Sequence, residues 1–204
     1  MKIVAIALSG GKSSRMGRDK ALLKINGEPL LFKTCQTALQ SADDVYVVAR
    51  SQEQYQQAIA DFNEHIFLVL DQKFDGALVG FWQGLKAIST QATPDWILLL
   101  ACDLPNVQSE ILQTWAEDLA NLSDSAIAYL PSYSDDNSQK KWEPLCGFYR
   151  WQVQDSLTEF INNGGRSFQR WLDYQEVVEI LDIPSIMLFN CNTPDDFRFL
   201  NQKI

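Results

Sequence analysis

The chain has 204 residues, of which 46% are hydrophobic and 21% are charged, and its formal net charge is −9. This length and composition are ordinary for one compact globular domain, so we expect residues 1–204 to form a single unit. The acidic surplus argues against DNA and RNA as partners, because neutralising their phosphates requires a surplus of basic groups.

Apolar runs and helical patterns alternate along the first part of the chain. Short apolar runs predict buried strands at residues 3–8, 44–49, 65–70 and 96–100. The patterns that follow them predict helices at residues 29–39, 52–62, 78–88 and 109–122. This alternation predicts a three-layer α/β/α fold of the Rossmann-like kind, in which helices cover both faces of a mostly parallel sheet. No apolar run approaches the ~20 residues of a membrane span, so no membrane contact is expected.

The rest of the chain is less regular. Further strands are predicted at residues 126–130, 145–149 and 177–181, with helices at 152–161 and 167–172. Thr193 is expected to cap a last helix, with Pro194 in its first position and Asp196 three residues after the cap. Residues 131–141 are polar and poor in apolar side chains, which predicts a mobile loop.

The cysteines and the single histidine limit the metal and redox chemistry that the chain can perform. Cys35, Cys102, Cys146 and Cys191 are widely spaced without a C-x-x-C pair, which argues against a zinc ribbon and a redox motif. We expect reduced, mostly buried thiols in a cytoplasmic protein. His65 is the only histidine, which leaves little for a Ser-His-Asp relay or a histidine-rich metal site.

The segment from Leu8 to Lys20 is the most informative part of the sequence. It follows the first predicted strand and reads L-S-G-G-K-S-S-R-M-G-R-D-K, with a glycine pair at Gly10 and Gly11. Glycines let backbone N–H groups approach phosphate oxygens, and basic side chains offset the negative charge. The spacing fits neither the P-loop nor the dinucleotide fingerprint, so a different nucleotide loop is indicated.

The loops that follow the predicted strands converge on one edge of the sheet. They span residues 9–20, 50–51, 71–80 and 102–106. Ligands of such sheets bind at the carboxyl ends of the strands, so we expect the binding site at this edge.

Two aspartates at this edge have both a functional and a structural interpretation. Asp103 follows the most apolar strand and is placed to hold Mg²⁺ together with substrate phosphates, although it could instead interact with the start of the next helix. Asp71 ends the third strand and could contact a base, a ribose or a metal, or form an ordinary Asx turn. Lys20 and Arg15 are placed to bind phosphate, with solvated surface charge as the alternative for either one.

The motifs together resemble the molybdenum cofactor guanylyltransferase family, and the resemblance runs nearly end to end. The matching segments are Leu8 to Lys20, Gly27-Glu28-Pro29-Leu30, Asp71 with Gly76 to Gly80, Cys102-Asp103-Leu104-Pro105, Glu143-Pro144-Leu145, and Asn190 to Asp196. Ser9 stands where the family usually has alanine, and Ala77 where it usually has proline. The family's asparagine after the second strand has no clear match near Arg50, so that nucleotide contact is left open.

The resemblance implies roles for individual residues and a nucleotidyltransferase form of the fold, with a nucleotide-binding N-terminal half and a pterin-binding C-terminal half. The implied nucleotide ligands are Leu8, Ser9, Gly10, Gly11, Lys20, Asp71 and Asp103. The implied pterin ligands are Arg15, Gly17, Asn190, Asn192 and Thr193. Lys20, Asp103 and Arg15 are the implied catalytic residues, and Asp103 is the implied metal ligand.

The implied reaction is transfer of GMP from GTP to the terminal phosphate of Mo-molybdopterin, with release of pyrophosphate. A phosphate nucleophile needs no strong base, and Mg²⁺, or Mn²⁺ in its place, is the implied cofactor. GTP and Mo-molybdopterin are the expected partners, followed by molybdoenzymes or their chaperones, and we expect a monomer. Two alternatives stay open: a related nucleotidyltransferase that uses CTP or a sugar-phosphate acceptor, and a non-catalytic nucleotide-binding regulator.

Overall fold

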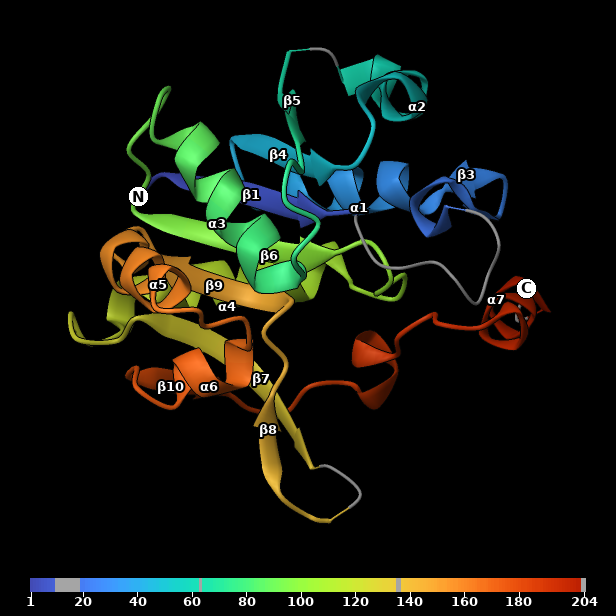
Figure 1. Ribbon diagram of the computed structural model, residues 1–204. Coiled ribbons are helices and arrows are strands. Elements are labelled where there is room, and N and C mark those ends of the chain that lie inside the picture. Colours follow the sequence, from blue (N-terminus) through green and yellow to red (C-terminus); the bar gives the residue numbers. More distant parts are fainter. Residues whose placement is uncertain (10–18, 63, 135–136, 203–204) are drawn as a thin grey trace.

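The computed structural model describes residues 1–9, 19–62, 64–134 and 137–202, and Figure 1 shows a twisted central sheet flanked by helices. The strands of the sheet follow the spatial order β10-β7-β9-β6-β1-β4-β5, and β8 pairs with β7. Their bounds are β1 Ile3–Leu8, β4 Asp44–Ala49, β5 Ile66–Leu70, β6 Trp96–Ala101, β7 Ala128–Ser134, β8 Lys140–Trp142, β9 Cys146–Arg150 and β10 Val177–Ile180.

The sheet is mostly parallel, as predicted. β1 lies between β4 and β6 and is parallel to both, β5 is parallel to β4, and β10 is parallel to β7. β9 is antiparallel to β6 and to β7. The reversal arises because the chain reaches β9 from β7 through the short β8 rather than through a crossover helix.

The prediction of a mobile loop at residues 131–141 is wrong for the residues that the structure describes. β7 continues to Ser134, and β8 returns antiparallel to it, with Ser132 opposite Trp142 and Ser134 opposite Lys140. Lys140 lies 4.4 Å from the centre of the Trp142 ring and donates to Glu179 of β10 at 2.6 Å. Polar contacts and ring packing stabilise this hairpin. Its sequence therefore lacks the alternation of apolar and polar residues by which a strand can be predicted. Residues 135–136 lie outside the described part.

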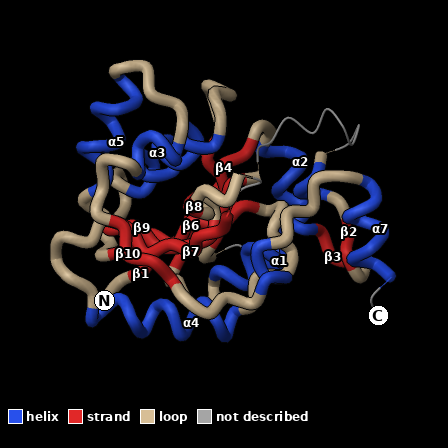
Figure 2. The backbone as a smooth tube through the Cα atoms, turned by 90° about the horizontal axis from the view of Figure 1, so that it is seen from below, coloured by secondary structure: helices blue, strands red, loops and turns tan. Residues whose placement is uncertain are grey.

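Helices cover both faces of the sheet, which confirms the three-layer arrangement (Figure 2). One face carries α3 Ala77–Ile88, α5 Val153–Asn162 and α6 Phe168–Leu172. The other carries α1 Leu30–Ala38, α2 Gln52–Gln56 and α4 Ser109–Asp118. Side chains of β1 alternate between the two cores: Val4 and Ile6 pack with α3, while Ala5 and Ala7 lie in the opposite cluster. This alternation explains why β1 is apolar at every position.

Short 3₁₀ helices connect several of these elements. They lie at Lys20–Leu22, Gln57–Phe62, Leu119–Asn121 and Ser185–Leu188.

The C-terminal segment crosses the carboxyl edge of the sheet. After β10 it passes the 3₁₀ turn Ser185–Leu188 and ends in α7 Pro194–Gln202, beside the small hairpin of β2 Lys24–Ile25 and β3 Glu28–Pro29 (Figure 1). Ile25, Leu30 and Leu200 form a separate apolar cluster there.

The predicted cap of α7 is confirmed. The Thr193 hydroxyl accepts from the Asp196 backbone N–H at 3.2 Å, and Asp196 Oδ2 accepts from the Thr193 N–H at 2.7 Å.

The four cysteines are free and buried, as predicted. None of the helices in the described ranges combines the length and the hydropathy needed to cross a membrane.

Candidate active site

A cavity of about 460 Å³ opens at the carboxyl edge of the parallel strands, and we name it the strand-end cavity. Its lining combines the ends of β1, β4 and β6 with the turn after Asp19, the loop between β5 and α3, and Leu145. The residues are Leu8, Ser9, Lys20, Ala21, Arg50, Asp71, Phe74, Asp75, Gly76, Ala77, Ala101, Cys102, Asp103 and Leu145. The predicted convergence of the strand-end loops is therefore confirmed.

Lys20 is positioned by the turn that precedes it. The Asp19 carboxylate caps this turn, accepting from the Ala21 N–H at 3.0 Å and from the Tyr55 hydroxyl at 2.5 Å. The Lys20 ammonium donates to Asn192 Oδ1 at 2.6 Å and lies 3.7 Å from Asp103 Oδ2. A cation held at its base and tip is well suited to meet a phosphate in a fixed place.

Asp103 combines burial with an unused oxygen. Its Oδ1 atom is buried and has no hydrogen-bond partner among the described residues. Burial raises the pKa of this carboxyl, and the nearby Lys20 ammonium acts in the opposite direction. The alternative role at the start of the next helix is not observed, because α4 begins at Ser109 and Gln108 is its N-cap. The structure therefore favours the functional interpretation of Asp103.

Asp71 fulfils its structural interpretation and also lines the strand-end cavity. Only 8% exposed, it accepts at Oδ1 from the N–H groups of Lys73 and Phe74 and from the Gln83 side chain, at 3.2, 3.0 and 2.7 Å. These bonds tie the loop after β5 to α3. None of these bonds involves Asp71 Oδ2, and the residue lines the strand-end cavity, so the two interpretations are compatible.

A second cavity, of about 560 Å³, lies beneath the β7–β8 hairpin, and we name it the hairpin cavity. It is lined by Ser132, Tyr133, Glu143, Ile183, Pro184, Leu188 and Asn190. The segment from Glu143 to Leu145 separates the two cavities, since Glu143 lines one and Leu145 the other.

Glu143 interacts electrostatically with Asp103. Burial raises the pKa of its carboxyl, the backbone bond from Leu145 opposes this, and the Asp103 charge adds to the increase. The two carboxylates are therefore close enough to interact across the boundary between the cavities. The sequence contained Glu143 within a motif but gave no indication of this placement.

The predicted pterin ligands are separated by the structure. Asn190 lines the hairpin cavity, and Asn192 meets Lys20 at the strand-end cavity. Thr193 caps α7 and lines neither cavity.

Among the predicted nucleotide ligands, Leu8 and Ser9 line the strand-end cavity. The Ser9 hydroxyl donates a hydrogen bond to the Val48 carbonyl at 2.8 Å. The predicted ligands Gly10, Gly11, Arg15 and Gly17 lie outside the described residues. Arg50 and Phe74 also line this cavity. Their loops were predicted at this edge, but neither residue was predicted as a ligand. The position of Arg50 directly after a buried strand was the one available signal for it.

Known proteins resemble this chain along most of its length. The family described as "MobA-like NTP transferase domain" matches residues 5–177. A protein of Nostoc sp. named "Probable molybdenum cofactor guanylyltransferase" is 46% identical over 204 residues, covering 97% of this chain and 90% of the relative. A protein of Synechococcus elongatus with the same name is 35% identical over 200 residues, covering 98% of each.

Solved structures share the fold. Molybdopterin-guanine dinucleotide biosynthesis protein A of Archaeoglobus fulgidus has a TM-score of 0.73 at 22% identity, covering 98% of this chain and 97% of that one. A 4-diphosphocytidyl-2C-methyl-D-erythritol synthase of Anaerococcus prevotii has a TM-score of 0.74 at 15% identity, covering 98% and 95%. The Rossmann-like α/β fold of nucleotidyltransferases is therefore the fold of this chain.

Proposed function

The chain belongs to the molybdenum cofactor guanylyltransferase family of MobA-like NTP transferases, and we propose that it transfers GMP from GTP to the terminal phosphate of Mo-molybdopterin. Pyrophosphate is released, and the product is the molybdopterin guanine dinucleotide. The observation that carries the assignment of the site is the Lys20–Asp103 pair at the strand-end cavity, with the hairpin cavity directly beyond Glu143.

GTP is assigned to the strand-end cavity and the pterin to the hairpin cavity. The strand-end cavity lies where parallel sheets of this kind bind nucleotides, and it contains the Lys20 cation. The hairpin cavity presents the apolar side chains of Ile183, Pro184 and Leu188 beside the polar Asn190. Both volumes are typical of small-molecule sites, and an apolar wall with a few polar groups suits a flat heterocycle.

The transfer needs positioning and charge neutralisation more than proton abstraction. An oxygen of the acceptor's terminal phosphate forms a bond to the α-phosphorus of GTP, and the bond from that phosphorus to pyrophosphate breaks. Lys20 binds and orients the phosphates, and Asn192 fixes the direction of its ammonium at 2.6 Å. A fixed cation contributes most where negative charge develops, so this pair accounts for a large part of the expected rate.

A divalent metal ion fits the residues that are present. Asp103 offers a buried oxygen that no described residue binds, and carboxylates are the protein ligands that Mg²⁺ prefers. No cluster of three or more His, Cys, Asp or Glu side chains occurs in the described ranges, so substrate phosphates would complete the coordination. We assign Asp103 as the ligand of Mg²⁺, or of Mn²⁺ in its place, where the ion would neutralise phosphate charge.

The cellular setting follows the same proposal. Four reduced, buried thiols favour a cytoplasmic location. We propose a monomeric enzyme that passes its product to molybdoenzymes or their chaperones.

The test measures pyrophosphate release from GTP and, in parallel, from CTP, with Mo-molybdopterin and Mg²⁺. Release with GTP and not CTP is expected, with losses of about 10²-fold or more in kcat for Lys20→Met and for Asp103→Asn. Lys24→Met is the matched control, because Lys24 is exposed on β2 and lines neither cavity.

Other outcomes would identify the alternatives. Release with CTP alone would make the chain a cytidylyltransferase. GTP binding without release, with any phosphate acceptor, would favour a non-catalytic regulator.

A further inference from the structure

The order of the strands separates the strand-end cavity into a phosphate end and a base end. Asp103 follows β6 and Arg50 follows β4, with β1 between them. Neighbouring strands lie about 4.8 Å apart, so these two positions are separated by roughly 10 Å along the sheet edge. If the phosphates lie at Lys20 and Asp103, the nucleoside extends toward Arg50 and the loop after β5. This inference therefore rests on the proposed function.

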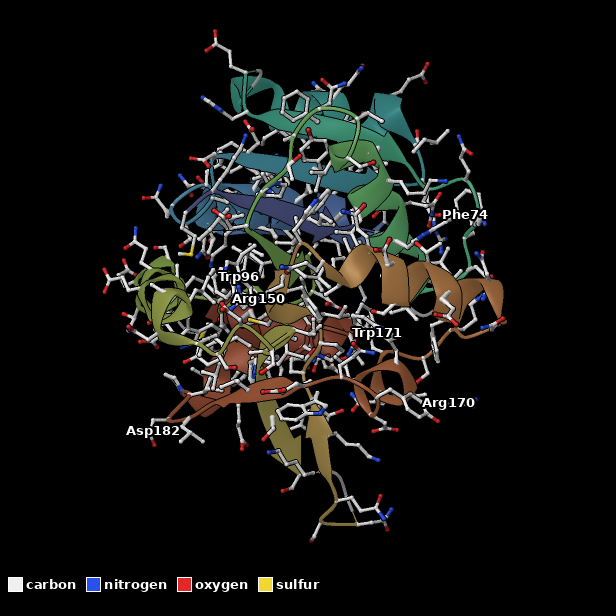
Figure 3. All side chains as sticks on the ribbon, turned by 90° about the vertical axis from the view of Figure 1, so that its left-hand side faces the viewer. Phe74, Trp96, Arg150, Arg170, Trp171 and Asp182 are labelled. Atoms are coloured by element: carbon white, nitrogen blue, oxygen red, sulfur yellow. The ribbon has the colours of Figure 1, made fainter. Side chains whose placement is uncertain are left out.

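Arg50 is supported by an aromatic ring at that end. Its guanidinium lies 5.4 Å from the centre of the Phe74 ring, and both residues line the cavity. Figure 3 shows Phe74 at the periphery, on the segment that leads into α3, and the residue is 51% exposed. A cation–π contact of this kind orients the guanidinium without neutralising its charge.

Phe74 has an uncommon backbone conformation. Phe74 has a φ of 50°, in the left-handed region that residues with side chains rarely occupy. Asp71 Oδ1 maintains this turn through the N–H groups of Lys73 and Phe74. A strained residue fixed by a buried carboxylate at a cavity edge is typical of a ligand-binding position.

Among the described residues, none occupies the N–H donors of Arg50. In the ranges that the structure describes, no carboxylate or carbonyl accepts a hydrogen bond from Arg50, and its side chain is exposed. Its guanidinium carries N–H donors in a fixed fork, suited to two acceptors that lie side by side.

We propose that Arg50 is the residue that selects guanine, by donating to O6 and N7 of the base while Phe74 supports its guanidinium. Guanine alone presents two adjacent acceptors on this edge. Adenine has the N6 donor beside N7, and cytosine presents its N4 donor, so each would leave Arg50 with an unmatched group. Arg50 is thus a specificity-determining residue for the base, distinct from the phosphate-binding Lys20.

The experiment measures the binding of GTP, 7-deaza-GTP, ATP and CTP to the full chain and to Arg50→Met. In 7-deaza-GTP a carbon replaces N7, so only one of the two acceptors is removed. The unchanged chain is expected to bind GTP at least ~5-fold more tightly than 7-deaza-GTP and ATP. In Arg50→Met the preference for GTP over 7-deaza-GTP should disappear, because the donor that senses N7 is absent.

Lys73→Met is the matched control. Lys73 lies in the same loop and also rests on an aromatic ring, 4.6 Å from the centre of Trp82, but it does not line the cavity. Its removal should leave all four affinities and their ratios unchanged. Both substituted side chains are exposed, so circular dichroism should show an unchanged fold.

Two results would overturn the inference. Equal weakening of GTP, ATP and CTP in Arg50→Met would show that Arg50 binds phosphate or ribose. A preference for GTP over 7-deaza-GTP that survives in Arg50→Met would show that another group reads the base. Either result can occur while GMP transfer proceeds normally, so failure of the inference is distinguishable from failure of the proposed function.

Discussion

At the scale of single residues, Asp103 has a carboxylate that the proposed reaction requires and that destabilises the folded chain. Its carboxylate is buried at the end of β6 with one oxygen unpartnered among the described residues, and its pKa is raised. A raised pKa means that burial penalises the charged form, which is the form that binds metal and faces Lys20. The proposed metal and phosphate binding requires the charged carboxylate, which explains why a buried acidic group stands at this position despite the penalty.

Asp103→Asn should therefore be more stable and nearly inactive. Above the folded-state pKa the wild-type carboxylate destabilises the folded chain, and this penalty disappears as the pH falls through that pKa. The midpoint of thermal unfolding should be higher for Asp103→Asn at pH 7, with the difference closing toward acid pH. Wild-type activity should decrease on the acid side at a higher pH than an ordinary aspartate would give.

The control for this prediction is Asp173→Asn, an exposed residue outside both cavities. It should change neither the unfolding midpoint nor the activity profile appreciably. An Asp103→Asn protein that unfolds at a lower temperature than wild type at pH 7 would contradict the argument.

Asp71 allows its structural and its binding contributions to be separated. Asp71→Ala leaves three donors without their shared acceptor and should lower the free energy of unfolding by about 2–3 kcal/mol. Asp71→Asn keeps the Oδ1 acceptor and should retain most of that stability. Urea denaturation measures both effects, and an Asp71→Ala chain as stable as wild type would refute them.

The family resemblance implies that Asp71 binds the nucleotide, and such a contact would depend on the charge that Asp71→Asn removes. GTP should bind about 10-fold or more weakly to this variant despite its intact fold. Unchanged binding of GTP would limit Asp71 to its role in the turn.

At the scale of elements, α3 is held close to β1 by two glycines. A Cβ on Gly84 would lie 2.8 Å from Ile6 Cδ1 and 3.0 Å from Ile6 Cγ2, while a Cβ on Gly80 would meet Leu8 Cδ2 at 3.4 Å. Both glycines lie within the helix, so alanine raises helix propensity equally at the two sites. Comparing Gly84→Ala with Gly80→Ala therefore isolates the effect of the distance between α3 and β1.

Gly84→Ala should destabilise the chain by about 1–2 kcal/mol, because overpacking against β1 exceeds the gain in propensity. Gly80→Ala should be neutral or stabilising by up to ~1 kcal/mol. Denaturant unfolding of both variants checks this, and Ile6→Val should partly restore stability in the Gly84→Ala background by removing Cδ1. Equal effects of the two alanines would show that α3 can shift away from the sheet.

What the sequence predicts at this scale depends on whether an element is buried on an apolar face. β1 and β6 are buried at every position and were predicted from their apolar runs alone. The β7–β8 hairpin, by contrast, is stabilised by contacts such as Lys140 with Glu179, between residues distant in sequence. No local pattern encodes such a pair, so the hairpin was mistaken for a loop.

The same distinction applies to the candidate site. Lys20 and Asp103 follow buried strands in recognisable motifs, so sequence reasoning found them and the structure brings them within 3.7 Å. Arg50 stands alone in its sequence context, and its partner Phe74 comes from the loop after another strand. The predicted convergence of the strand-end loops places both residues at one sheet edge, but only the fold shows that their side chains meet.

At the scale of the whole molecule, the C-terminal segment connects the site to the β2–β3 hairpin. The Cys191 N–H donates to the Asp103 carbonyl at 2.8 Å, and Asn192 contacts Lys20 one residue later. Asp196 Oδ2 accepts from the Asn192 and Thr193 N–H groups, and α7 packs through Leu200 against the cluster at β2 and β3. Docking of a helix outside the main cores thereby fixes a side chain within the site.

Disrupting the cap of α7 should impair the reaction at a distance. Asp196→Ala removes the acceptor that holds Asn192 and should destabilise the first turn of α7 by about 1 kcal/mol. The released segment carries Asn190 and Asn192, so acceptor KM should rise and kcat should fall, by roughly 10-fold combined. GTP affinity should change by less than ~2-fold, because Lys20 keeps its charge and its Asp19-capped turn.

The neighbouring Asp195→Ala is the control, since Asp195 is exposed and pairs only with Arg198 among the described residues. Steady-state kinetics with each substrate varied, together with GTP titration, would refute this coupling if both variants behaved like wild type or if Asp196→Ala weakened GTP and the acceptor equally.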